Sequence, residues 1–132
     1  MKSTISMVFA AALAIVATNA AQAQGNPEGV NPEHYACYRV SPAKPFKPLP
    51  VFLKDQFGAA KGAVVQETFL CAPVSKNEQP IKDERTHLMC YTLKMAKAGN
   101  KAVEVVNQFG KSIMKVGPIS LLCVPSLKIV LK

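Results

Sequence analysis

Apolar and polar side chains alternate at period two through much of the chain after residue 34. The clearest alternating pairs are Tyr38 and Val40, Val51 and Leu53, Tyr91 and Leu93, and Val103 and Val105. This period is typical of strands with one buried face, and Pro and Gly punctuate the segments between them. The pattern predicts an all-β fold, a small antiparallel sandwich or barrel.

The two halves of this region carry the same motifs in the same order, at an offset of 52 to 53 residues. The matched pairs are His34 with His87, Cys37 with Cys90, Tyr38 with Tyr91, Lys44 with Lys97, Asp55-Gln56-Phe57-Gly58 with Asn107-Gln108-Phe109-Gly110, Leu70-Cys71-Ala72-Pro73 with Leu122-Cys123-Val124-Pro125, and Lys76 with Lys128. Such agreement in register indicates an internal duplication. We expect one domain, residues 34–132, built of pseudo-symmetric units 34–76 and 87–128 of three to four strands each, joined by a connector at 77–86.

The Asp/Asn-Gln-Phe-Gly motifs, residues 55–58 and 107–110, predict turns. Gly58 and Gly110 are expected to take positive φ, and the Asp or Asn that opens each motif to accept a backbone hydrogen bond from two residues on.

A third strand should follow each turn, residues 64–71 and 112–123, the latter broken at Gly117-Pro118 because proline cannot donate to a ladder. Residues 129–131 are expected to add a terminal edge strand.

The N-terminal stretch has the pattern of a signal peptide. A basic residue, Lys2, precedes an apolar run over residues 7–17 and the small-x-small sequence Ala21-Gln22-Ala23. The run is too short for a bilayer span of about 20 residues. We therefore predict a signal peptide at 1–23, a flexible segment at 24–33, and a secreted or periplasmic location.

All four cysteines follow the predicted cleavage site, and an oxidising compartment favours two disulfides. In a three-strand meander, Cys37 and Cys71 would lie at opposite ends, about 20 Å apart and beyond disulfide reach. The preferred pairing is therefore Cys71 with Cys90 and Cys37 with Cys123. A chain reversal at Gly117-Pro118 would restore pairing within each unit.

A metal site is the alternative to disulfides, because each unit opens with His-x-x-Cys. His34 and His87, with two cysteines, have the ligand types of a tetrahedral zinc site. Two cysteines would then be left over, so the sequence favours disulfides and predicts no metal or other cofactor.

The doubled order His-x-x-Cys-Tyr, Asp/Asn-Gln-Phe-Gly and Leu-Cys-x-Pro-x-x-Lys resembles an uncharacterised family of bacterial secreted and cell-surface domains built of two such units. The likeness covers His34 to Lys128. It implies an extracytoplasmic β domain and no particular activity.

The charge balance points to an anionic partner. The whole chain carries +8, and removal of residues 1–23 leaves 15 Lys and Arg against 8 Asp and Glu, a net +7. Most of these residues are Lys, which suits diffuse attraction to acidic polysaccharide or lipid headgroups better than nucleic-acid recognition. The oligomeric state is not evident from the sequence.

No nucleophile elbow or phosphate-binding loop is present, and Asp55 is replaced by Asn107 in the second unit, so no acid repeats there. The preferred hypothesis is a non-catalytic binding or structural module. The alternative is a small extracytoplasmic hydrolase, or a metal-binding protein, that uses His34 and His87.

Overall fold

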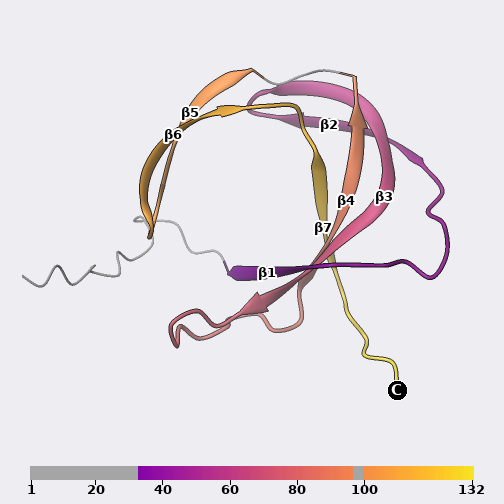
Figure 1. Cartoon of the computed structure of the whole chain (residues 1–132), viewed down its shortest axis with the longest axis vertical. Coiled ribbons are helices and arrows are strands. Elements are labelled where there is room, and N and C mark those ends of the chain that lie inside the picture. The colour runs from indigo at the N-terminus through magenta and orange to yellow at the C-terminus, as the bar shows by residue number, and fades with distance from the viewer. Residues whose placement is uncertain (1–32, 97–99) are drawn as a thin grey trace, which may run out of the picture.

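The computed structural model describes residues 33–96 and 100–132, which form seven strands and no helix (Figure 1). The strands are β1 (His34–Arg39), β2 (Leu49–Asp55), β3 (Gly58–Val74), β4 (His87–Met95), β5 (Lys101–Asn107), β6 (Gly110–Val116) and β7 (Leu121–Ser126). The predicted all-β class is confirmed. The predicted signal peptide, residues 1–23, and all but the last residue of the segment 24–33 lie outside the described residues.

All pairings are antiparallel, in a five-stranded sheet and a two-stranded one. The larger sheet has the order β1-β3-β4-β7, and β2 also pairs with β3. The first half of β3 pairs with β2 and its second half with β1, so β1 and β2 run in the same direction. The segment between them, residues 40–48, contains three prolines and carries the chain along in extended form without reversing it.

The two disulfides join cysteines within each unit, Cys37 to Cys71 and Cys90 to Cys123. In each pair the cysteines lie directly opposite each other on antiparallel strands, with Cα atoms 3.9 and 4.0 Å apart. The preferred pairing of Cys71 with Cys90 and Cys37 with Cys123 is therefore wrong. It assumed a meander, whereas β1 and β3 are antiparallel neighbours.

The core lies where the two units meet, along β3 and β4. Val64 faces Leu93 in the register, and these side chains are 6% and 7% exposed. The inner cysteines, Cys71 and Cys90, are each 2% exposed, and their Sγ atoms are 3.7 Å apart. The two disulfides thus pack against each other across the β3–β4 junction.

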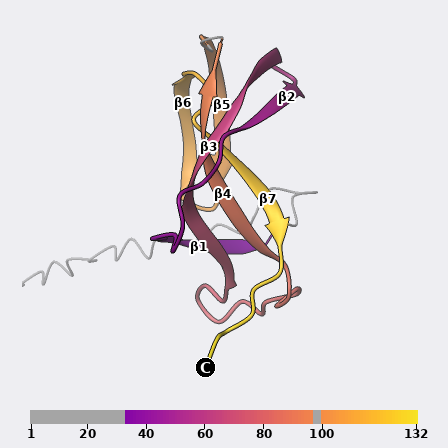
Figure 2. The same ribbon diagram turned by 90° about the vertical axis from the view of Figure 1, so that its right-hand side faces the viewer.

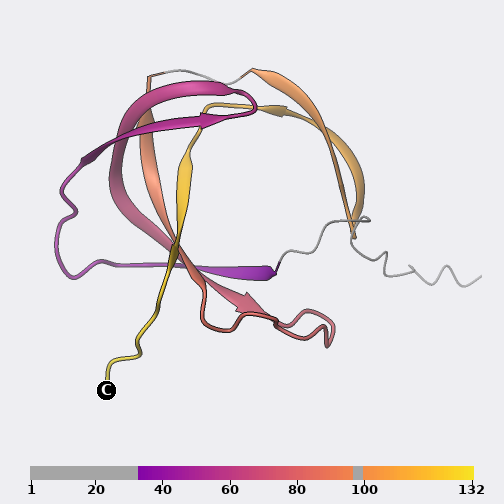
Figure 3. The same ribbon diagram turned by 180° about the vertical axis from the view of Figure 1, so that it is seen from behind.

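The second unit differs from the first in its last strand. The chain leaves the ladder after Val116 and re-enters it at Leu121, so the β5–β6 hairpin forms its own sheet. This is the break predicted at Gly117-Pro118. Figure 2 shows this hairpin diverging from β2–β3 at the end of the sheet away from the C-terminus. The edge strand predicted at 129–131 is absent: the chain after Ser126 forms no strand and runs away from the sheet (Figure 3).

Candidate functional site

Both Asp/Asn-Gln-Phe-Gly motifs form turns of the same construction. Asp55 Oδ1 accepts a hydrogen bond of 2.8 Å from the backbone N–H of Phe57. Asn107 Oδ1 accepts an equivalent bond of 2.8 Å from Phe109. The glycines that close the motifs have φ angles of 138° and 121°, which a residue with a Cβ adopts only with strain. Each turn therefore presents its Gln and Phe side chains at the tip of a hairpin.

The turn of the second unit contacts the first unit. The β5–β6 hairpin bends back toward the start of β1 (Figures 1 and 3), where Nε2 of Gln108 donates to Nε2 of His34 at 2.9 Å. Lys76 Nζ lies 4.8 Å from the centroid of the Phe109 ring. We call these four residues the clasp, because they join the His and Lys of one unit to the Gln and Phe of the next.

The clasp is a contact of modest energy. A neutral hydrogen bond contributes about 0.5–1.5 kcal/mol. An exposed cation–π pair contributes about 0.5–1 kcal/mol, and the Phe109 ring is 83% exposed. Interactions of this size can select one direction for the β5–β6 hairpin, because its two strands pair only with each other.

A tight turn after β3 places Lys76 for this contact. The backbone N–H of Gln79 donates to the Lys76 carbonyl at 3.1 Å. Asn77 and Glu78, within the turn, have φ of 49° and 62°, a left-handed conformation that is uncommon without glycine. Glu33 Oε1 then accepts bonds from the backbone N–H groups of residues 82 and 83, at 2.7 and 2.9 Å, which ties the connector to the start of β1.

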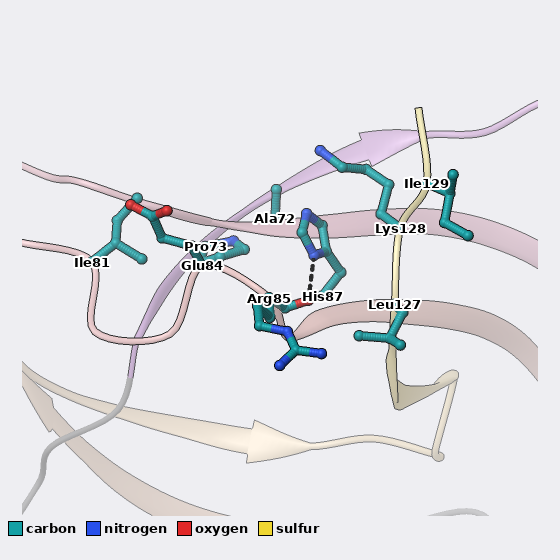
Figure 4. Close-up of a pocket in the computed structure, with 9 residues that line it drawn as sticks. All are labelled: Ala72, Pro73, Ile81, Glu84, Arg85, His87, Leu127, Lys128 and Ile129. Carbon is teal, nitrogen blue, oxygen red and sulfur yellow. Dashed lines mark hydrogen bonds between the residues drawn. The ribbon is translucent and has the colours of Figure 1, made fainter. Parts of the chain in front are cut away.

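The second unit carries the same His and Lys, and there they line a pocket of about 540 Å³ (Figure 4). Its walls combine apolar and charged side chains, among them Ile81, Leu127 and Ile129 together with Glu84, Arg85 and Lys128. Figure 4 shows the His87 ring between Ala72 and the Lys128 side chain. The pocket is thus the counterpart, in position and residue type, of the surface that holds Gln108 and Phe109.

The orientation and tautomer of His87 are fixed by the connector. This side chain is 6% exposed, and its Nδ1 lies 3.0 Å from the carbonyl oxygen of Arg85. A carbonyl only accepts, so Nδ1 carries the proton and Nε2 of the neutral ring is an acceptor. Hydrogen bonds from the side chain and backbone of Thr86, and from the backbone N–H of Arg85, hold the pKa of Asp83 below its usual value. That turn fixes the carbonyl to which His87 donates.

The structure does not bring His34 and His87 together. They lie on β1 and β4, on opposite sides of β3, which separates their strands by about 10 Å. All four cysteines are in disulfides, and within residues 33–96 and 100–132 no three His, Cys, Asp or Glu side chains are grouped to hold a metal. The shared site required by the hydrolase and metal alternatives is not formed by the described residues.

A second surface gathers positive charge. Register places Phe52 opposite Lys61, and Ala63 opposite Lys94, so the side chains of Phe52, Lys54, Lys61 and Lys94 share the outer face of β2, β3 and β4. We call these four residues the lysine face. All are exposed, Phe52 by 62%. None of the three lysines is paired with an acidic side chain of the described chain.

A family model described as a repeat of unknown function, DUF7450, matches residues 6–125. The chain belongs to this family. The matched residues begin before the region that carries the doubled motifs, residues 34–128, and include nearly all of that region. Neither the comparison with curated proteins nor that with solved structures found a match. In the part of the chain that the structure describes, no helix has the length and apolar character needed to cross a bilayer.

The residues of the clasp could be singled out from the sequence, but the contact between Gln108 and His34 could not. His34, Gln108 and Phe109 stood out because each is duplicated, yet they were interpreted as separate motifs of a strand and a turn. The missing information was the direction of the β5–β6 hairpin. The available signal was the Gly117-Pro118 break itself, since a strand that stops there releases the hairpin from the sheet.

Proposed function

We propose that the protein is a non-catalytic binding module that acts outside the cytoplasm and holds acidic cell-surface polysaccharide on the lysine face. The observation that supports this proposal is the grouping of three exposed lysines on one face without an acidic partner among the described residues. Charges gathered in this way raise the local concentration of an anionic polymer.

The chemistry of the lysine face suits a polymer better than a compact ligand. Lysine is a hydrated point charge on a flexible stem, so it accommodates carboxylates at variable positions. The exposed ring of Phe52 lies among the lysines and offers an apolar surface beside them. The net +7 of residues 24–132 adds attraction at longer range.

The extracytoplasmic location rests on the predicted signal peptide and on the cysteines. Every cysteine is in a disulfide, as is usual for proteins of oxidising compartments. Intact-mass analysis of the exported protein should find Gln24 as the first residue. A mature chain that retains residues 7–17 would contradict export by cleavage.

Retention on immobilised hyaluronate, with neutral dextran as the reference matrix, tests the polysaccharide proposal. We expect retention on hyaluronate to weaken between low and physiological salt, because exposed charges are screened over about 8–10 Å there. The variant K54S/K61S/K94S should elute at markedly lower salt than the wild type. The control variant K101S/K115S/K132S, with the same change of charge, should elute later than the first.

Two outcomes would contradict the proposal. Equal losses in the two triple variants would assign the binding to net charge alone and remove the lysine face from it. Binding of phosphatidylserine vesicles that depends on the lysine face, with no retention on hyaluronate, would assign the face to lipid headgroups.

A further inference from the structure

The pocket around His87, which we call the His87 pocket, is where the two units differ in what their histidine binds. In unit one, Nε2 of His34 accepts an amide N–H from Gln108, at the tip of the released β5–β6 hairpin. The equivalent hairpin, β2–β3, stays paired with β4, where Gly62 lies opposite Met95 at the far end of that strand from His87. Nε2 of His87 has no hydrogen-bond partner among the described residues.

This nitrogen is a hydrogen-bond acceptor that faces the pocket. The His87 side chain is 6% exposed, and its bond to the Arg85 carbonyl fixes the tautomer in which Nε2 is unprotonated. In Figure 4 the Nε2 edge of the ring faces Ala72 and the Lys128 ammonium, away from the Arg85 carbonyl. A buried acceptor that lacks a donor is costly, so an occupant of this pocket gains affinity by supplying an N–H or O–H group.

The charges in the pocket wall favour a monoanion. Lys128 and Arg85 supply two positive charges and Glu84 one negative charge, which leaves a surplus of one positive charge. Neither cation forms an ion pair with an acidic side chain of the described residues. Lys128 lies on the Nε2 side of His87, so an anion at its ammonium would be next to the acceptor (Figure 4). The wall therefore favours a carboxylate attached close to a hydrogen-bond donor.

Most of the remaining wall is aliphatic. Ile81, Leu127 and Ile129 line the pocket together with Ala72 and Pro73. Leu127 and Ile129 are 72% and 82% exposed, and neighbouring exposed apolar side chains of this size mark binding surfaces. The volume of about 540 Å³ is within the range of about 300–1,000 Å³ that is typical of ligand sites. An aliphatic group in the pocket would remove these side chains from water.

The carboxyl terminus of a peptide combines these three groups. Its last N–H, its carboxylate and its last side chain are all attached to one carbon atom. A fatty acid would leave Nε2 of His87 without a donor, and a phosphate group, with a charge of about −1.5 to −2, would exceed the surplus charge of the pocket. The bond from Gln108 to His34 is the example within the molecule of an amide N–H held by the equivalent histidine.

We propose that the His87 pocket binds the carboxyl-terminal residue of a peptide whose last side chain is aliphatic. The last N–H of the peptide donates to Nε2 of His87, and the carboxylate pairs with the Lys128 ammonium. The aliphatic side chain lies against Leu127 and Ile129. The site shares no residue with the lysine face, so this proposal is independent of polysaccharide binding.

An NMR titration with the peptide acetyl-Ala-Ala-Leu tests the proposal. The amide resonances of residues 84–87 and 127–129 should shift and saturate with a Kd of about 1 mM, because few atoms of so short a peptide are in contact. The nitrogen resonance of the unprotonated Nε2 of His87 should shift as it accepts the peptide N–H. Shifts that do not saturate below about 10 mM would overturn the proposal.

Three altered peptides test the three contacts without changing the protein. A carboxamide end should weaken binding about tenfold, because it carries no charge. An ester oxygen in place of the last N–H should weaken binding about fivefold, because it supplies no donor. A final glycine should weaken binding about tenfold, because it has no side chain to bury. An altered peptide that binds as tightly as acetyl-Ala-Ala-Leu would show that the contact it lacks is not made, and would overturn the proposal.

Two protein variants place the binding site. Lys128 and Lys132 are both exposed, and K128S should weaken binding about tenfold, whereas the control K132S, with the same change of charge, should bind as the wild type does. Circular dichroism and a free-thiol assay establish that each variant is folded with both disulfides. Equal losses in the two variants, tighter binding of octanoate than of the peptide, or saturating shifts at residues 54, 61 and 94 instead would each overturn the proposal.

Discussion

The two units differ most where their last strands begin. In the first, β3 runs without interruption from Gly58 to Val74, with register irregularities between Val64 and Gln66 and between Glu67 and Phe69. In the second, the same stretch is divided into β6 and β7. The first unit bends its strand at a bulge, whereas the second breaks it.

The residues at this position explain the difference. Val65-Gln66 in the first unit is replaced by Gly117-Pro118 in the second. Proline has no N–H for the ladder and fixes φ, so a continuous strand is not available there. The β2–β3 hairpin therefore stays on the sheet beside β4, while the β5–β6 hairpin leaves it and reaches His34. A dipeptide thus decides which partner a hairpin finds, although the hairpin motifs are the same.

The largest effects should come from removing the disulfides. We expect the two units to lose similar amounts of unfolding free energy. The bonded cysteines are 34 and 33 residues apart, so the chain-entropy model assigns each disulfide about 4 kcal/mol. Denaturant unfolding of C37S/C71S and C90S/C123S should give similar losses of unfolding free energy. A difference above about 1 kcal/mol would show that one unit depends more on its disulfide than chain entropy explains.

Exchanging the dipeptides should exchange the behaviour of the hairpins. We expect G117V/P118Q to make β6 and β7 continuous and to separate Gln108 from His34, at a cost of about 1–2 kcal/mol from the lost clasp. Amide hydrogen exchange at residues 117–120 should slow, and the nuclear Overhauser contact between Gln108 and His34 should vanish. The reverse exchange, V65G/Q66P, should also be destabilising, because Pro would enter β3 where Gln66 pairs with Thr92 of β4. Persistence of the Gln108–His34 contact in the first variant would contradict the role given to the break.

The matched glutamines give a smaller and cleaner test. Q108A removes the hydrogen bond to His34 and should lower the unfolding free energy by about 1 kcal/mol. Q56A, at the equivalent position, should change it by less than about 0.5 kcal/mol in dilute protein, because this exposed side chain has no bonded partner within the described residues. Thermal or denaturant unfolding measures both. Equal losses of unfolding free energy in Q108A and Q56A would mean that the bond from Gln108 to His34 does not stabilise the fold.

The smallest effect concerns the turn before β4. The pKa of Asp83 is lowered by its hydrogen bonds to Thr86 and Arg85, so the folded state favours the carboxylate. The stabilisation is complete above the ordinary pKa of 3.8, and it is lost as pH falls below that value through the folded pKa. A carbon-detected NMR titration should find the Asp83 midpoint below 3.8, the ordinary value. In D83N the stability difference from the wild type should shrink as pH falls through this window.

Period-two alternation, the duplicated motifs and the Asx turns were all predictable from the sequence, because each depends on residues close together in the chain. The disulfide pairing was not predicted, because it depends on whether residues 40–48 reverse the chain. Those nine residues, extended at about 3.1 Å each, span nearly 28 Å, far more than a hairpin needs. The four prolines at 42, 45, 48 and 50 were therefore the signal that β1 and β2 run in the same direction. The contact between Gln108 and His34, 74 residues apart, required the direction of a whole hairpin and had no local signal beyond Gly117-Pro118.

The two disulfides have a mechanical consequence for a chain pulled from its ends. Tension entering at Cys37 passes through sulfur to Cys71, and tension entering at Cys90 passes to Cys123, so both hairpins are bypassed and bear no load. The only part of the protein between these covalent shortcuts that can lengthen is the 19-residue stretch from Cys71 to Cys90. Its contour length is about 65 Å, whereas the sulfur atoms at its ends start 3.7 Å apart. The protein therefore acts as a short tether with a fixed maximum extension, held closed by the β3–β4 ladder.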